Sequence, residues 1–133
     1  MTKKIVNPWQ WQDKHGFVHG LEVTGAAQTL YCAGQVSVDA EGNPIHAGDM
    51  AAQLHAAFDN LEEVLRQAGY GLADVVRLNY YTTDIPAFHR NGQIVGERLA
   101  RGDCRPSSTL LGVAALFHPD AMIEIEATAV KPS

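Results

Sequence analysis

The sequence predicts a single α+β domain in which a mixed sheet carries two helices packed on one face. Three observations support this fold class. A helical repeat of apolar residues occupies the middle of the chain, and strand-like runs flank it on both sides. The length of 133 residues suits one hydrophobic core. We therefore interpret residues 1–133 as one domain.

The first third of the chain is dominated by strand signals. We predict strands at Lys3–Val6, Phe17–Thr24 and Thr29–Ser37, because β-branched and aromatic residues recur there between turn-forming residues. The segment Asp39–Asp49 contains the turn sequence Gly42-Asn43-Pro44. That composition predicts a loop.

Two helices are expected next. In the first, apolar residues recur at steps of four, three and four, and they are Leu54, Phe58, Leu61 and Leu65. This spacing places them on one face. Asp49 is a suitable N-cap, and Gly69 is a suitable left-handed stop. The second helix is predicted to begin after Asp84, with a proline in its first turn, and to end at Gly102.

The remaining strands are predicted at Val75–Thr83, Ser107–Leu116 and Met122–Val130. Side chains alternate along a strand, so in the last one Ile123 and Ile125 face the helices, while Glu124 and Glu126 face away. That second face is mixed in character rather than fully polar. Such a surface favours a partner, and further copies of the same chain are the simplest one.

Composition limits the classes of function. Lys and Arg total 10 against 15 Asp and Glu, giving a formal charge of −5. This balance disfavours nucleic acid as a partner, because such binding depends on neutralising phosphates. The six histidines and two cysteines show no metal-ligand spacing, so no metal site is expected. Cys32 is interpreted as a core residue, and Cys104 as an accessible thiol in a loop.

No segment indicates a membrane or a secretory route. The start of the chain, Met1–Pro8, lacks the apolar stretch of a signal peptide. The longest apolar run, around residues 110–117, is far too short to span a bilayer. We therefore expect a cytoplasmic protein with no membrane partner.

Glu124 and Glu126 are the first candidates for chemistry. Their carboxylates should leave the same strand face roughly 6–7 Å apart. A carboxylate partly removed from water has a raised pKa and can shuttle protons near neutral pH. The alternative is that both are solvated strand residues, or that they pair with Arg77. Likewise, the hydroxyls of Ser107-Ser108-Thr109 are either ligands in a site or polar residues at a strand entry.

Nine segments, spread in order over nearly the whole chain, form a recognisable pattern. They are Phe17–Gly20, Ala33–Val36, Phe58–Leu65, Ala68-Gly69, Asp74–Val76, Thr82–Asp84, Pro106–Thr109, Gly112–Leu116 and Ile123–Ala127. In sequence, order and spacing these segments resemble the Rid family (YjgF-type, RidA-like) of imine and enamine deaminases, also labelled endoribonuclease L-PSP.

The resemblance implies a chorismate-mutase-like homotrimer with a central β-barrel and with sites in the clefts between subunits. It also implies cofactor-free hydrolysis of small reactive imines and enamines, such as 2-aminoacrylate, to a carbonyl product and ammonia. In that family a glutamate on the last strand holds the attacking water. Here it corresponds to Glu124, with Gly34 and Phe17 completing the pocket.

One departure from the family pattern concerns the substrate. The family's substrate-clamping arginine follows the proline by two residues, and that position is Ser108. Arg105 precedes Pro106 and reaches the cleft only if the loop is rearranged. We therefore expect the clamp to be absent and the substrate to lack a carboxylate, held by Ser108, Thr109 and the N-terminal tryptophans.

Three other functions stay open from the sequence. A non-catalytic small-molecule-binding or protein-interaction trimer is favoured by the missing arginine and opposed by the retained Glu124 and Gly34. A ribonuclease or translation inhibitor is opposed by the acidic charge balance. A chorismate mutase would rest on fold analogy alone.

Overall fold

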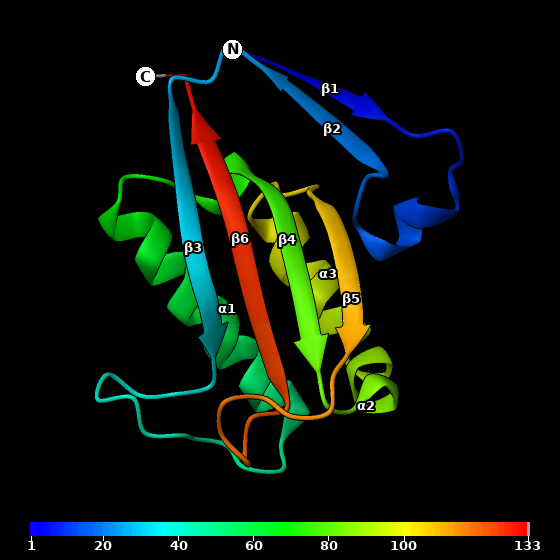
Figure 1. Ribbon diagram of the computed structural model, residues 1–133. Coiled ribbons are helices and arrows are strands. Elements are labelled where there is room, and N and C mark those ends of the chain that lie inside the picture. The colour runs from blue at the N-terminus through cyan, green and yellow to red at the C-terminus, as the bar shows by residue number, and fades with distance from the viewer. Residues whose placement is uncertain (133) are drawn as a thin grey trace.

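The computed structural model describes residues 1–132 and contains two sheets. A four-stranded sheet has the order β3-β6-β4-β5, and β1 and β2 form a separate hairpin beside it (Figure 1). The strands are β1 (Thr2–Val6), β2 (Gly20–Thr24), β3 (Gln28–Val36), β4 (Val75–Thr82), β5 (Ser107–Gly112) and β6 (Ile123–Lys131). The helices are α1 (Met50–Gln67), α2 (Ile85–Arg90) and α3 (Gly92–Arg101), with 3-10 helices η1 (Trp11–His15) and η2 (Leu72–Asp74).

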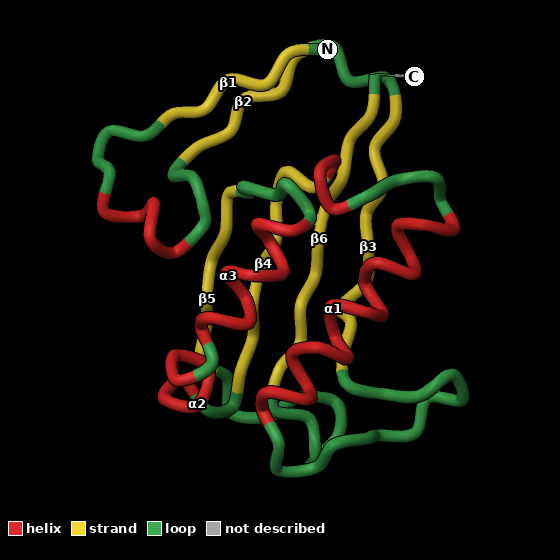
Figure 2. The backbone as a smooth tube through the Cα atoms, turned by 180° about the vertical axis from the view of Figure 1, so that it is seen from behind, coloured by secondary structure: helices red, strands yellow, loops and turns green. Residues whose placement is uncertain are grey.

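The larger sheet is mixed. Strand β6 is antiparallel to both β3 and β4, whereas β4 and β5 are parallel. Seen from behind, α1 and α3 cover one face of this sheet and leave the other face uncovered (Figure 2). The predicted α+β class and the one-sided packing of helices are therefore confirmed.

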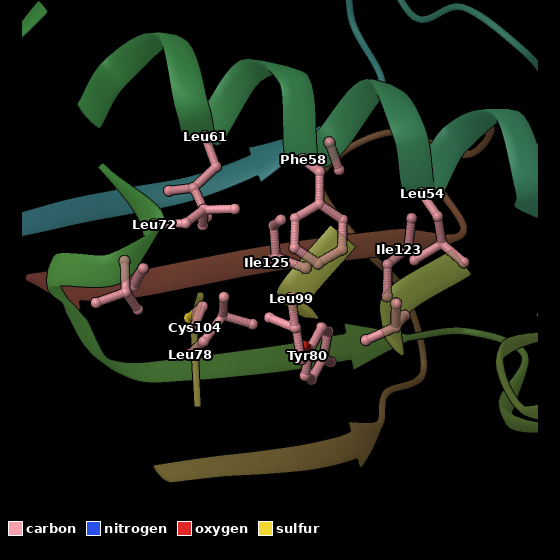
Figure 3. Close-up of a cluster of buried hydrophobic side chains, with 14 of the residues drawn as sticks. Leu54, Phe58, Leu61, Leu72, Leu78, Tyr80, Leu99, Cys104, Ile123 and Ile125 are labelled. Carbon is pink, nitrogen blue, oxygen red and sulfur yellow. The ribbon is translucent and has the colours of Figure 1, made fainter. Parts of the chain in front are cut away.

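The core lies between α1 and the middle of the sheet. Leu54, Phe58 and Leu61 are fully buried and lie over Ile123 and Ile125 of β6 (Figure 3). Each such side chain contributes roughly 1.5–3 kcal/mol through removal of apolar surface from water. This layer fixes the orientation of β6, and with it the outward direction of the alternating glutamates.

Both predicted ends of α1 are confirmed. The Asp49 side chain accepts a hydrogen bond from the Ala52 N–H, 3.0 Å away. Gly69 follows the helix at a φ of +83°, and the Tyr70 N–H returns to the Leu65 carbonyl at 2.8 Å. Glycine is favoured here because a left-handed residue with a Cβ is strained.

The second helical segment divides in two, so three helices cover the sheet rather than two. The break falls at Asn91, whose φ of −110° leaves the helical range. Its side-chain amide donates to the Ala87 carbonyl at 2.8 Å. A side chain that bonds the backbone in this way competes with helix continuation, and the following Gly92 has poor helix propensity.

Two predicted strands were too long, for a common reason. Strand β5 ends at Gly112 instead of Leu116, because its partner β4 ends at Thr82, the residue paired with Gly112. Strand β2 begins at Gly20 instead of Phe17, because Gly20 pairs with Val6, the last residue of β1. A strand extends only as far as its neighbour supplies hydrogen bonds.

Candidate functional site

Glu124 and Gly34 lie together although they are 90 positions apart in the chain. Glu124 is on β6 and Gly34 on the neighbouring β3, where the register shifts between Cys32 and Gln35. A Cβ added to Gly34 would lie 1.8 Å from Oε2 and 2.6 Å from Cδ of Glu124. The carboxylate therefore lies directly on the glycine backbone, in space that any other residue would occupy.

The two glutamates of β6 are in different electrostatic states. Partial burial, and then the negative charge of Glu126, raise the pKa of Glu124 above its usual value. Glu126 instead accepts hydrogen bonds from the Tyr81 hydroxyl and from Nδ2 of Asn79, the latter at 3.4 Å. Glu126 is thus a satisfied acceptor, whereas Glu124 is the carboxylate prepared to take a proton.

Arg77 forms no ion pair with Glu124 or Glu126. Its Nη2 donates to Oγ1 of Thr109 at 2.7 Å, from β4 to the neighbouring β5. Thr109 therefore faces the uncovered side of the sheet. Ser108, the next residue of the same strand, must face the helix side because side chains alternate. The structure thus separates the two hydroxyls that the sequence suggested as a joint substrate contact.

A pocket of about 720 Å³ lies on the helix side, between η1, α3 and the strands β4 and β5. Phe17 and Ser108, two of the predicted substrate-binding residues, both line it. The wall also includes Leu110, two residues beyond Ser108 on the same strand face. Its volume is within the range of small-molecule sites.

Arg105 lies outside this pocket. Its Nη2 contacts Oδ1 of Asp13 at 2.7 Å and the Phe17 carbonyl at 3.4 Å. The guanidinium therefore fastens the η1 segment to the start of β5, which holds Phe17 against the pocket. Ser108, where the sequence resemblance implies a substrate-binding arginine in related chains, lines the pocket with a hydroxyl instead.

Neither N-terminal tryptophan belongs to the pocket lining, and the two pack instead against Phe17 and His19. Trp11 meets Phe17 edge-on at 5.9 Å between ring centroids and His19 at 4.9 Å. Trp9 meets His19 at 5.2 Å. Both indole rings are largely exposed to solvent. They support the aromatic wall from outside.

Within one chain, the Glu124 carboxylate and the pocket cannot contact the same small molecule. Glu124, a residue of β6, faces the uncovered side of the sheet and its carboxylate lies against Gly34 of β3, whereas the pocket lies on the helix side beside β5. Strands β3 and β5 are the two opposite edges of the sheet (Figure 1). The predicted site residues therefore form two half-sites: Gly34 with Glu124, and Phe17 with Ser108.

The thiol of Cys104 is not accessible, contrary to the sequence interpretation. Cys104 is 2% exposed, and burial raises its pKa to about 12. It follows α3 directly and its backbone N–H bonds to the Leu99 carbonyl at 2.9 Å, which turns the residue into the core. Such a thiol is a packing residue rather than a nucleophile. Cys32, as predicted, is also buried.

The described part of the chain holds no helix that is both long and apolar enough to cross a membrane. Over the same residues, no three side chains of His, Cys, Asp or Glu gather closely enough to bind a metal ion.

The sequence model of the family described as endoribonuclease L-PSP matches residues 12–131. The chain belongs to the Rid (YjgF/RutC) family. A solved Rid family protein, YyfB from Yersinia pestis, is similar in fold with a TM-score of 0.87 and 35% identity, covering 98% of this chain and 100% of that one. Its function is described as unknown.

Relatives of known family also belong to the RutC group. A RutC family protein of Pyrococcus horikoshii is 32% identical over 106 residues, which cover 80% of this chain and 82% of the relative. The 3-aminoacrylate deaminase RutC of Acinetobacter baylyi is 29% identical over 106 residues, with the same coverage of both chains. The predicted Rid membership is confirmed.

Several pocket residues of this Rid chain were missed from the sequence. The sequence pattern of these residues is typical of a hydrophobic core, yet all of them line the pocket. They are Tyr80, Phe88, Val95, Leu99 and Leu110. Only Leu110 carried a usable signal, because it shares a strand face with Ser108. The others come from different elements, and only the packing of α3 against the sheet brings them together.

Proposed function

We propose that this Rid chain hydrolyses reactive imines or enamines to a carbonyl product and ammonia, without a cofactor. Glu124 is assigned the role of the proton-accepting group. The observation that carries the proposal is the Glu124 carboxylate lying on the backbone of Gly34 with a raised pKa. Rid membership supports the reaction class.

The chemistry needs little beyond this carboxylate. Glu124 accepts a proton as the oxygen of water bonds to the imine carbon, and the electron pair of the C=N bond moves to nitrogen. The proton is returned to nitrogen, which gives a carbinolamine. The second proton of the former water then moves from the hydroxyl oxygen to nitrogen, the C–N bond breaks, ammonia leaves and a carbonyl group remains. An enamine enters the same route after a proton moves from its nitrogen to its β-carbon, which converts it to the imine. The imine carbon is already electrophilic, so a positioned water and a proton acceptor supply the needed catalysis.

The complete site is proposed to form between copies of the chain. A head-to-tail contact of the β3 edge of one copy with the β5 edge of the next would bring the Gly34–Glu124 half-site beside the Phe17–Ser108 half-site. Such heterologous contacts close into rings, and a homotrimer is the ring we propose. Tyr31 on β3, 79% exposed, supports an unpaired contact surface at that edge.

The test is a turnover assay with a matched pair of variants. Imines are generated in place by an amino-acid oxidase or an amine oxidase, and ammonia release is timed with and without the protein. Glu124→Gln should lower the acceleration by about 10²-fold or more. Glu63→Gln, the same change at an exposed position of α1, should leave it unchanged. An absence of acceleration across the imine panel, or a stable monomer in light scattering, contradicts the proposal.

A binding-only role is the second candidate, and one observation favours it. Ser108 stands where the family clamp would be, so part of the family machinery is missing. A protein of this kind would bind imine-derived carbonyl compounds but show equal ammonia release for the unmodified protein and for Glu124→Gln. The same assay therefore separates the two functions.

A further inference from the structure

We propose that the pocket beside α3 binds an uncharged hydrocarbon or aromatic group of the substrate. Its substrates would then be imines of hydrophobic aldehydes or ketones, rather than imines that carry a carboxylate. This inference rests on the proposed function, because it names the substrate class of the same site. It is carried by the distribution of apolar and charged residues over the pocket wall.

The buried part of the pocket is almost entirely apolar. Its buried or half-buried side chains are Phe17, Tyr80, Phe88, Val95, Leu99, Pro106, Ser108 and Leu110. In Figure 3, Tyr80 and Leu99 lie next to each other at this end of the core. Among these eight side chains only Ser108 and Tyr80 carry a polar atom, in each case a hydroxyl. A surface of this kind binds hydrocarbon by removing it from water.

The Lys, His and Glu side chains of the pocket lie at its rim. Lys14, His15, His89 and Glu97 all belong to its lining, and all four are exposed. No arginine belongs to that lining among residues 1–132. Arg105, the nearest sequence candidate, is bound to Asp13. A carboxylate placed on the apolar floor would lose its hydration without gaining a cation, which is strongly unfavourable.

Two probes with the same hydrocarbon group test this directly. They are 4-methyl-2-pentanone and 4-methyl-2-oxopentanoate, which share an isobutyl group and a ketone and differ in the carboxylate. Their dissociation constants are measured by calorimetry or by ligand-observed NMR on the full-length protein. The neutral ketone should bind at least about tenfold more tightly than the keto acid.

A pocket-filling variant supplies the structural control. A Cβ at Gly96 of α3 would meet no atom within 4 Å, and Gly96 lines the pocket. Gly96→Phe therefore fills the cavity from an exposed helix position without disturbing the core, and it should weaken ketone binding at least tenfold. Arg101→Phe, on the same helix outside the pocket lining, should leave binding unchanged. Thermal melting of both variants verifies that they are folded.

Each outcome is decisive. Equal or tighter binding of the keto acid overturns the inference. A failure of both probes to bind at millimolar concentration overturns it as well, as does unchanged ketone binding in Gly96→Phe. Ketone binding without imine turnover refutes the proposed function but leaves the pocket assignment intact. If Gly96→Phe leaves imine turnover unchanged, the pocket assignment is refuted and the proposed function stands.

Discussion

The contact between Gly34 and Glu124 makes the sharpest prediction. In Gly34→Ala the new Cβ would lie 1.8 Å from Oε2 of Glu124, against the 3.4 Å at which ordinary van der Waals contact begins. The difference, 3.4 − 1.8, means that the carboxylate must move by about 1.6 Å. A displacement of about 1 Å at a reacting group can cost about 10²-fold in rate. We expect kcat/KM to fall by about that factor.

Stability should respond far less than activity. The displaced atoms belong to a half-buried side chain, which can be held about 30° off its rotamer at a cost of about 0.5–1.5 kcal/mol. Urea unfolding of Gly34→Ala should therefore give a free energy of unfolding within about 1.5 kcal/mol of the unmodified protein. Gly71→Ala is the matched control, because a Cβ there meets nothing within 4 Å.

A double-mutant cycle decides whether the loss acts through Glu124. Once the carboxylate is removed in Glu124→Ala, the further change Gly34→Ala has nothing left to displace and should cost no more activity. Full activity in Gly34→Ala, or additive losses in the double variant, would refute the reasoning that the carboxylate must rest on the glycine.

Four further predictions follow from the side-chain environments. The raised pKa of Glu124 places the acid limb of the kcat/KM profile above pH 4.5, and Glu126→Gln should move it to lower pH; an unmoved limb counts against Glu124 as the titrating group. Because the pKa of Glu124 is raised in the folded protein, protonated Glu124 stabilises the fold at low pH, and this stabilisation is lost as the pH rises through the folded pKa. Glu124→Gln, which is neutral at every pH, should therefore have a larger free energy of unfolding than the unmodified protein at pH 7, as measured by urea titration. Arg98, 5% exposed, bonds two carboxylates of α1 and lies 5.4 Å from the Phe58 ring centroid; Arg98→Ala should lower the free energy of unfolding by roughly 1–3 kcal/mol, since its partners stay solvated, and a loss under about 0.5 kcal/mol would contradict this. A thiol reagent at pH 8 should leave Cys104 unmodified in the folded protein and label it after denaturation, and rapid labelling of the native state would show that it is accessible.

Helix α1 shows how far local pattern reaches. Its cap at Asp49, its apolar stripe and its stop at Gly69 are all decided by neighbours within a few positions, and all were predicted. The outward direction of Glu124 also followed from alternation with the buried Ile123 and Ile125. These features depend on periodicity and capping, which the chain carries in consecutive residues.

Features that depend on a partner strand were not predictable in the same way. The ends of β2 and β5 are fixed by where β1 and β4 end. The burial of Cys104 depends on the turn that follows α3. The bond between Arg105 and Asp13 joins residues 92 positions apart. No local pattern encodes the position of a distant neighbour.

The sequence by itself determined the α+β class, the main helix, the family and the identity of the acidic residue at the centre of the proposal. Only the tertiary structure decided that Thr109 accepts a hydrogen bond from Arg77 of the neighbouring strand, and that an apolar pocket lies beside α3 on the other side of the sheet from Glu124. The physical reason is that a periodic pattern assigns each side chain to a face. The chemistry of a site depends instead on which faces of distant segments are packed together, and that is settled only when the sheet and its helices assemble.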